Sequence, residues 1–140
     1  MLKVVIDTNV LVSALVKPGS GPEIIISLAL SGEIILCLSD PIFVEYEEVL
    51  KRGKFSKLNQ SKVKELLLRI RSQAQWVEPK TRLEVTLVDP EDNKFLECAM
   101  EAGADLLITG NVKHFPKKHK DMRIVSPAQF LSYIVKTLDF

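Results

Sequence analysis

The chain has 140 residues, of which 46% are hydrophobic and 26% are charged, and its net charge is +1. This length is enough for one compact domain that buries roughly 68% of its unfolded surface, so we expect residues 1–140 to fold as a single unit. The net charge gives no overall sign of a nucleic-acid-binding protein, and neither a secretory signal nor a membrane-spanning apolar run is present. We therefore expect a cytoplasmic protein without a membrane partner.

The first predicted element is a strand over residues 2–6, where the run Leu-Lys-Val-Val-Ile is typical of a parallel strand buried on both faces. Asp7 follows this strand directly. Because apolar residues then recur at helical spacing, Asp7 lies at a junction between a strand and a helix. An N-cap is the commoner explanation for Asp7 taken alone, and a functional carboxylate is the alternative. The apolar residues of this helix are Val10, Leu11, Ala14 and Leu15.

A second buried strand, over residues 34–38, leads into a helix predicted over residues 41–51. Glu45 and Glu47 border opposite edges of the apolar face of this helix, and periodicity alone does not choose between them. A solvated side chain is the common explanation for a single helical glutamate. A functional role for Glu45 is therefore indicated only by the presence of the other acidic residues.

A basic amphipathic helix is predicted over residues 61–75, and a further helix over residues 91–102. Asp89 and Pro90 form a conventional N-cap and first-turn pair, which leaves Asp92 without an obligatory capping role. The apolar residues of the helix recur at spacings that direct Asp92 along the buried stripe. A carboxylate that points inward needs a cation or hydrogen-bond donors to remain ionised, so we interpret Asp92 as functional.

Two more strands are predicted, at residues 106–108 before Thr109 and Asn111, and at residues 123–125 before Ser126. Strands that alternate with helices in this way predict a three-layer α/β/α fold with a central parallel sheet. Ligands of open parallel sheets bind beyond the carboxyl ends of the strands.

In such a fold Asp7, Glu45 and Asp92 would lie close together at that edge of the sheet. Clustered carboxylates repel one another, and a hard cation that prefers oxygen ligands relieves the repulsion. The three acids therefore predict a divalent-metal site and metal-dependent phosphoester chemistry.

Other candidate ligands do not form a second site. His114 and His119 have no further ligands at a defining spacing. Cys37 and Cys98 fall in a predicted buried strand and helix without CxxC spacing, so we expect reduced core thiols.

Basic residues crowd the loop after Asn111, where they would flank the acidic site. Such residues can hold backbone phosphates while the acids hold a metal. A solvated basic loop explains them about equally well. The lysines in question are Lys113, Lys117, Lys118 and Lys120.

Four segments, in this order, carry a resemblance to a known family. They are Val4 to Asn9, Ser39 to Leu50, Asp89 to Leu96, and Ala102 to Asn111. Together they resemble the PIN-domain ribonucleases, and in particular the VapC-like toxins of prokaryotic toxin-antitoxin pairs, over nearly the whole chain. The combination is specific, whereas any single segment would be weak.

The resemblance assigns roles to named residues. Asp7, Glu45 and Asp92 match the metal-binding acids of the family, and Thr8 and Asn9 match the polar residues that support the first acid. The resemblance also implies an endoribonuclease that uses Mg2+ or Mn2+ and cleaves RNA, together with a cognate antitoxin and a homodimer. The helix over residues 61–75 is one candidate dimer surface.

Asn111 departs from the family pattern, since many members carry a fourth acid there. An amide oxygen can still bind Mg2+ or orient a water, but it adds no negative charge, so one and two bound metals are both alternatives. Asn111, Thr109 or Thr8 would position the attacking water.

Two other functions deserve comparison. A receiver or aspartyl-phosphate enzyme would also carry an acidic pocket at strand ends, but the segment from Asp7 to Asn9 lacks the second aspartate of the DxDxT phosphatase pattern. The other alternative is a catalytically weakened PIN-fold module that binds RNA or a protein. Tight metal binding without cleavage of any RNA would favour it.

Overall fold

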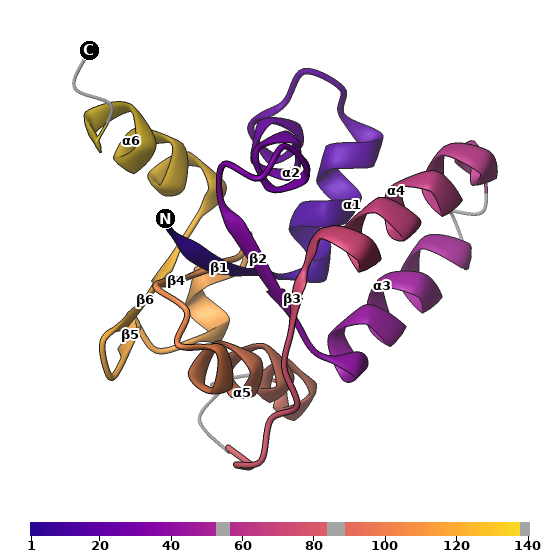
Figure 1. The fold of residues 1–140 in the computed structure, drawn as a ribbon. Helices are drawn as coiled ribbons and strands as arrows, with labels where there is room; N and C mark the ends of the chain where they lie inside the picture. The colour runs from indigo at the N-terminus through magenta and orange to yellow at the C-terminus, as the bar shows by residue number, and fades with distance from the viewer. Residues whose placement is uncertain (53–56, 84–88, 138–140) are drawn as a thin grey trace.

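The computed structural model describes residues 1–52, 57–83 and 89–137, which form a six-stranded sheet with the order β3-β2-β1-β4-β6-β5 (Figure 1). Among these residues the strands pair in parallel, except for β5 and β6. The mostly parallel sheet confirms the prediction, and β5 corrects it, because an antiparallel hairpin stands where a basic loop was expected. The strands are β1 (Lys3–Ile6), β2 (Ile35–Leu38), β3 (Gln75–Trp76), β4 (Leu106–Ile108), β5 (Lys118–His119) and β6 (Met122–Val125).

Helices cover both faces of the sheet, which confirms the predicted three-layer arrangement (Figure 1). On one face α1 and α2 pack against each other, and on the other face α5 packs against β1, β2 and β4. α3 and α4 pack together toward the β3 end of the sheet, and α6 contacts α2. The helices are α1 (Thr8–Val16), α2 (Gly21–Leu30), α3 (Asp40–Lys51), α4 (Gln60–Gln73), α5 (Asn93–Ala102) and α6 (Pro127–Thr137), with 3-10 turns η2 (Pro90–Asp92) and η3 (Val112–His114).

Two helix boundaries differ from the predictions. The helix predicted over residues 61–75 ends at Gln73, because the chain then extends into β3 and pairs with β2. The helix predicted over residues 91–102 becomes α-helical only at Asn93, since η2 precedes it as a 3-10 turn. The second difference changes the direction in which Asp92 points.

Burial between the layers accounts for the uniformly apolar sequence of β1. Val4, Val5 and Ile6 are fully buried, as expected for a parallel strand with helices on both sides. Cys37 and Cys98 are buried and free, as predicted. No single helix in the described part of the chain is long and apolar enough to cross a membrane, and α1 and α2 meet that test only as a pair bent by 107°.

Hydrogen bonds hold the ends of separate elements at one edge of the sheet. The Asp7 N–H donates to the carbonyl of Ile108 at 2.9 Å, so the carboxyl ends of β1 and β4 are level. The buried hydroxyl of Tyr46, on α3, donates to the carbonyl of Ile6. These contacts fix α1, α3 and the segment after β4 around the same point.

Candidate active site

Asp7 is the most buried of the three predicted acids, with 6% of its surface exposed. It precedes α1 with the extended backbone of an N-cap, but its side chain makes no capping hydrogen bond. Its Oδ2 instead accepts a hydrogen bond of 2.7 Å from the hydroxyl of Thr109, which follows β4. The carboxylate of Asp7 therefore faces the neighbouring strand end, with the backbone N–H of Asn9 close enough to lower its pKa.

The structure distinguishes Glu45 from Glu47 on α3. Glu45 is partly buried; its Oε2 accepts a hydrogen bond from the Thr8 hydroxyl, and its Oε1 lies 2.7 Å from Nζ of Lys94 on α5. Glu47 has a more exposed side chain and pairs with Lys51 of the same helix at 4.0 Å. Glu45 is thus the glutamate at the sheet edge, and Thr8 contacts this second acid and not the first.

Asp92 is the last residue of η2 and leaves the capping role to Asp89. The Asp89 side chain accepts a hydrogen bond of 2.9 Å from the Glu91 N–H, as predicted, whereas Asp92 makes no capping bond. Its Oδ2 lies 3.7 Å from Nδ1 of His114 in η3. Asp92 is partly exposed and does not lie in the buried stripe, because a 3-10 turn rotates each residue further than an α-helix does.

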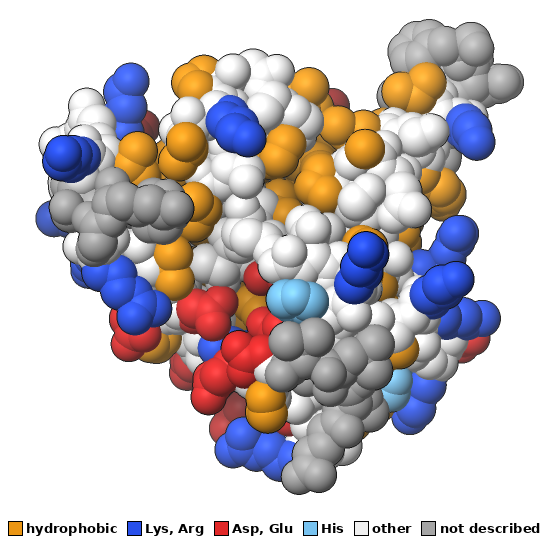
Figure 2. Space-filling model, turned by 180° about the vertical axis from the view of Figure 1, so that it is seen from behind, with side chains coloured by type: hydrophobic (Ala, Val, Ile, Leu, Met, Phe, Trp, Pro, Cys, Tyr) orange, Lys and Arg blue, Asp and Glu red, His pale blue; other side chains and the backbone are white. Residues whose placement is uncertain are grey.

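Burial and mutual repulsion make these carboxylates costly to ionise together. Burial raises the pKa of Asp7 from 3.8 to about 6, and the charges of Asp92 and Glu45 add to the rise, while its hydroxyl hydrogen bond opposes it. Burial also raises the pKa of Asp92, with further contributions from Asp89 and Glu45. Figure 2 shows acidic side chains gathered on one face of the molecule beside a histidine, with lysines and arginines around them. The three acids therefore form one electrostatic cluster.

Two basic partners of the acids were not assigned a role from the sequence. Lys94 lies 2.7 Å from Glu45 and 3.6 Å from Glu91, and His114 faces Asp92. Burial disfavours the charge of Lys94, but its two glutamate partners outweigh burial and raise its pKa. A lysine in the first turn of a helix opposes the helix dipole, and that was the available signal for a paired role.

The contacts of Glu45 with Lys94 and of Asp92 with His114 affect how these acids could bind a metal ion. Among the residues that the structure describes, no three His, Cys, Asp or Glu side chains are grouped so that they could hold a metal ion. Glu45 contacts an ammonium group and Asp92 an imidazole in this arrangement, so the acids are close but turned toward separate partners.

The polar residues after β4 form a hydrogen-bonded chain that leads to Asp7. The backbone N–H of Asn111 donates to Oγ1 of Thr109 at 3.0 Å, and that hydroxyl donates to Asp7. Oδ1 of Asn9 accepts the Gly110 N–H at 3.2 Å, which ties the start of α1 to the same segment. Asn111 is exposed and precedes η3 as its N-cap residue, so its backbone, two residues after Thr109, ends this hydrogen-bonded chain.

The four lysines predicted to bind RNA separate into two pairs. Lys113 in η3 and Lys117 before β5 line a cavity of about 880 Å³ between α6 and the outer strands. Lys118 lies in β5, and Lys120 lies in the hairpin turn with a φ of 55°; neither is among the residues that line this cavity.

The fold and the site define an α/β protein with an acidic cluster at the carboxyl edge of its sheet, where such folds bind their ligands. The chain belongs to the PIN domain family, since its residues 3–113 match the model of the PIN domain. The family consists of nucleases that generally depend on divalent metal ions. The predicted family is thereby confirmed.

Individual relatives are similar over most of the chain. The uncharacterized protein MJ1680 of Methanocaldococcus jannaschii is 29% identical over 146 residues, which cover 96% of this chain and 93% of that protein. The fold is similar to DNA-bound VapBC from Salmonella typhimurium (TM-score 0.62, 18% identity, 91% of this chain and 99% of that chain). It is also similar to VapBC2 from Rickettsia felis bound to a promoter DNA fragment (TM-score 0.59, 14% identity, 89% of this chain and 98% of that chain). A third similar fold is that of VapBC-1 from nontypeable Haemophilus influenzae (TM-score 0.58, 19% identity, 91% of this chain and 99% of that chain). At these identities the likeness to the solved structures establishes the fold.

Proposed function

We propose that this protein is a metal-dependent endoribonuclease that hydrolyses RNA phosphodiester bonds, built as one PIN domain over residues 1–140. The observation that carries the proposal is the meeting of Asp7, Glu45 and Asp92, from three separate elements, at the carboxyl edge of the sheet. The chain's membership of a nuclease family supports the same chemistry.

The three acids are the residues that would hold Mg2+ or Mn2+. Their donor chemistry fits a hard divalent cation, because all are carboxylates and burial raises the pKa of Asp7 to about 6, a cost that a bound cation removes. To bind the ion together, Glu45 must turn from Lys94, and Asp92 must turn from His114. Such an ion supplies a bound water of lowered pKa and stabilises negative charge on the leaving oxygen.

The chain's own polar groups orient the acids. The Thr109 hydroxyl holds Asp7 at 2.7 Å, and the Thr8 hydroxyl holds Glu45, so each acid has a fixed partner next to the site. Asn111, exposed and bonded through its backbone N–H to Thr109, orients the attacking water.

Four lysines in and after η3 hold the RNA backbone on one side of the cut. They are Lys113, Lys117, Lys118 and Lys120. Single-stranded or looped RNA suits the site, because its phosphates can approach the acids without the opening of a duplex.

We further propose that the protein is the toxin of a toxin-antitoxin pair in the cytoplasm. The support is the similarity of its fold to chains in three VapBC complexes. A small antitoxin would cover the acidic cluster, and a homodimer through α4 is the expected assembly.

A catalytically weakened module that binds RNA or a partner protein is the second candidate. Asn111 favours it, since the residue brings no negative charge, and so does the ion pair that holds Glu45 on Lys94.

The proposal is tested by incubating the protein with transfer, ribosomal and unstructured RNAs in Mg2+ or Mn2+, with EDTA and an identically purified Asp7→Asn variant as controls. Cutting that needs the metal and that the variant lacks would support the nuclease. The absence of cleavage with either metal would favour the second candidate, a module that binds RNA or a protein without cleaving RNA.

We expect Asn111→Asp to lower the metal concentration needed for half-maximal cleavage by about tenfold, because an added carboxylate raises the charge of the ligand set. Calorimetric titration with Mn2+ should show tighter binding or a second ion. Asn59→Asp is the matched control, since Asn59 caps α4 through bonds to Ser61 and Lys62, and Asp caps equally well. Identical metal binding in both variants would place Asn111 outside the ligand set.

We expect Lys94→Met to tighten Mn2+ binding about fivefold, because the ion would no longer compete with an ammonium group for Glu45. The matched control is Lys51→Met, which removes the same charge from the exposed pair with Glu47. Calorimetry on both variants measures the difference. Weaker binding in Lys94→Met would instead mean that the lysine orients Glu45 for the metal.

A further inference from the structure

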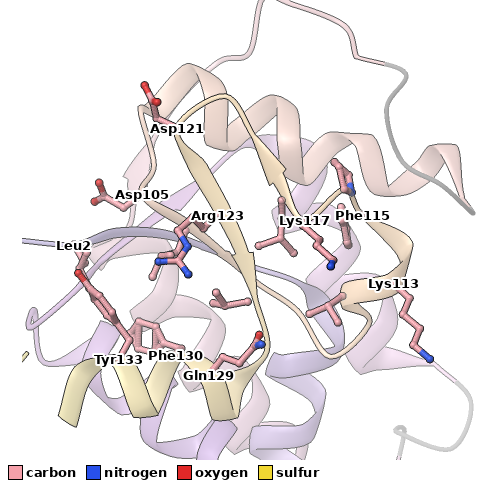
Figure 3. A pocket seen from close by; sticks show the side chains of 15 residues that line it. Leu2, Asp105, Lys113, Phe115, Lys117, Asp121, Arg123, Gln129, Phe130 and Tyr133 are labelled. Atoms are coloured by element: carbon pink, nitrogen blue, oxygen red, sulfur yellow. The ribbon is translucent and has the colours of Figure 1, made fainter. Parts of the chain in front are cut away.

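The cavity that Lys113 and Lys117 line begins next to η3, the turn that carries His114. It measures about 880 Å³, within the range of about 300–1,000 Å³ that is usual for ligand sites, and it lies between α6 and the strands β4 and β6. Its apolar lining includes the buried side chains of Phe115, Ile124 and Phe130. Tyr133 is 44% exposed at its edge, and Figure 3 shows Phe130 and Tyr133 side by side on α6.

Basic and acidic side chains lie toward opposite ends of this cavity. Lys113, Lys117 and Arg123 line it, and among the described residues no ion pair engages them. In Figure 3, Arg123 lies at the middle of the lining, and Lys117 and Lys113 lie toward η3. Asp105 and Asp121 lie at the opposite end, where the Asp105 carboxylate accepts a backbone N–H of β1 at 2.9 Å. The cavity is thus basic at the end near η3.

The basic end adjoins the acidic cluster. Val112 and Lys113 line the cavity and directly follow Asn111, and His114 of the same turn lies 3.7 Å from Asp92. A polymer that placed one phosphate at the acids would therefore continue into the cavity. The match to the PIN domain model ends at residue 113, and most of the lining comes after it.

We propose that this cavity is a nucleotide subsite that receives the single-stranded RNA next to the scissile phosphate. Lys113, Lys117 and Arg123 contact the phosphates, and a base lies on the apolar lining against Tyr133. Single-strand sites in other proteins combine these two elements, a basic groove and an aromatic surface on which bases stack. The inference rests on the proposed function for the identity of the ligand.

The test is a binding measurement that needs no cleavage. Fluorescence anisotropy with a labelled ten-nucleotide single-stranded RNA in EDTA compares the wild type with Arg123→Gln, Lys117→Gln and Lys80→Gln. Each change removes one positive charge from an exposed residue, but Lys80, which follows β3, does not line the cavity and has no proposed role in RNA binding. We expect each of the first two variants to weaken binding by about tenfold and to flatten the salt dependence, and Lys80→Gln to stay within about twofold. Equal effects of all three changes would mean that the positive charges attract RNA wherever they lie on the surface. That result would overturn the subsite.

A photo-crosslink locates the base. RNA that carries 4-thiouridine at successive positions should link to the segment from Val112 to Tyr133 only when the label lies within about three nucleotides of the cut. Crosslinks that map elsewhere would overturn the proposal. If RNA binds as expected but is never cut, the nuclease proposal fails and the subsite stands. If RNA is cut while Arg123→Gln binds like Lys80→Gln, the subsite alone fails.

Discussion

Replacement of Asp7 by Asn is expected to lower metal-dependent RNA cleavage by ~10³-fold or more, and yet to stabilise the metal-free protein at neutral pH. Asn keeps the shape of the side chain, and its Oδ1 can still accept the 2.7 Å hydrogen bond from Thr109. It removes the charge that the proposed metal requires. It also removes a buried charge that the folded protein stabilises poorly.

The gain in stability should depend on pH in a defined direction. The pKa of Asp7 is about 6 in the folded protein against an ordinary value of 3.8. Between these values the folded protein keeps a proton that the unfolded chain has released, so the free energy of unfolding falls as the pH rises. The loss is complete above about pH 6 and amounts to ~3 kcal/mol for a shift of this size. The Asn variant lacks this loss.

Urea unfolding in EDTA across this pH range measures the effect. The variant should match the wild type near pH 4 and exceed it above pH 6, and added Mn2+ should stabilise only the wild type. Asp105→Asn is the control at the opposite edge of the sheet, where the carboxylate accepts the Lys3 N–H, and it should show neither behaviour. Equal stability of variant and wild type at pH 7.5 would contradict the assignment of Asp7 as a buried charge.

Sequence periodicity was sufficient for most of the fold, for a physical reason. A strand between two helical layers has no polar face, so the uninterrupted apolar run of β1 identifies both the strand and the layers around it. β3 and β5 are two residues long, and pairing with β2 and β6 creates them. No local pattern distinguishes so short a strand from a loop.

The candidate site was predictable only where chain position restricts a side chain. Asp7 follows a strand directly, so its place at the sheet edge is given by the strand itself. Glu45 and Glu47 both border the apolar face of α3, and only the contacts with Thr8 and Lys94 distinguish them. Those contacts join residues far apart in the sequence, and the order of residues in a single chain does not display them.

Asp92→Asn is the second change from which we expect a large effect, with cleavage reduced by ~10²-fold or more and Mn2+ affinity by about tenfold. The carboxylate lies 3.7 Å from His114, and it contributes to the raised pKa of Asp7. The variant should fold normally, since Asp92 makes no capping hydrogen bond. In metal-free buffer it should be at least as stable as the wild type, because one of the repelling charges is gone.

Asp89→Asn is the control that separates the effect of losing the carboxylate at position 92 from the effect of losing any negative charge nearby. Asp89 lies three residues away, its side chain accepts the Glu91 N–H at 2.9 Å, and Asn can take over this cap. Both variants lose one negative charge near the start of α5, so a general electrostatic effect on RNA or metal binding would appear in both. We expect calorimetric Mn2+ titration and RNA cleavage to change only for Asp92→Asn. Unchanged Mn2+ affinity in Asp92→Asn would remove this residue from the metal site, and the proposed ion would then rest on Asp7 and Glu45 alone.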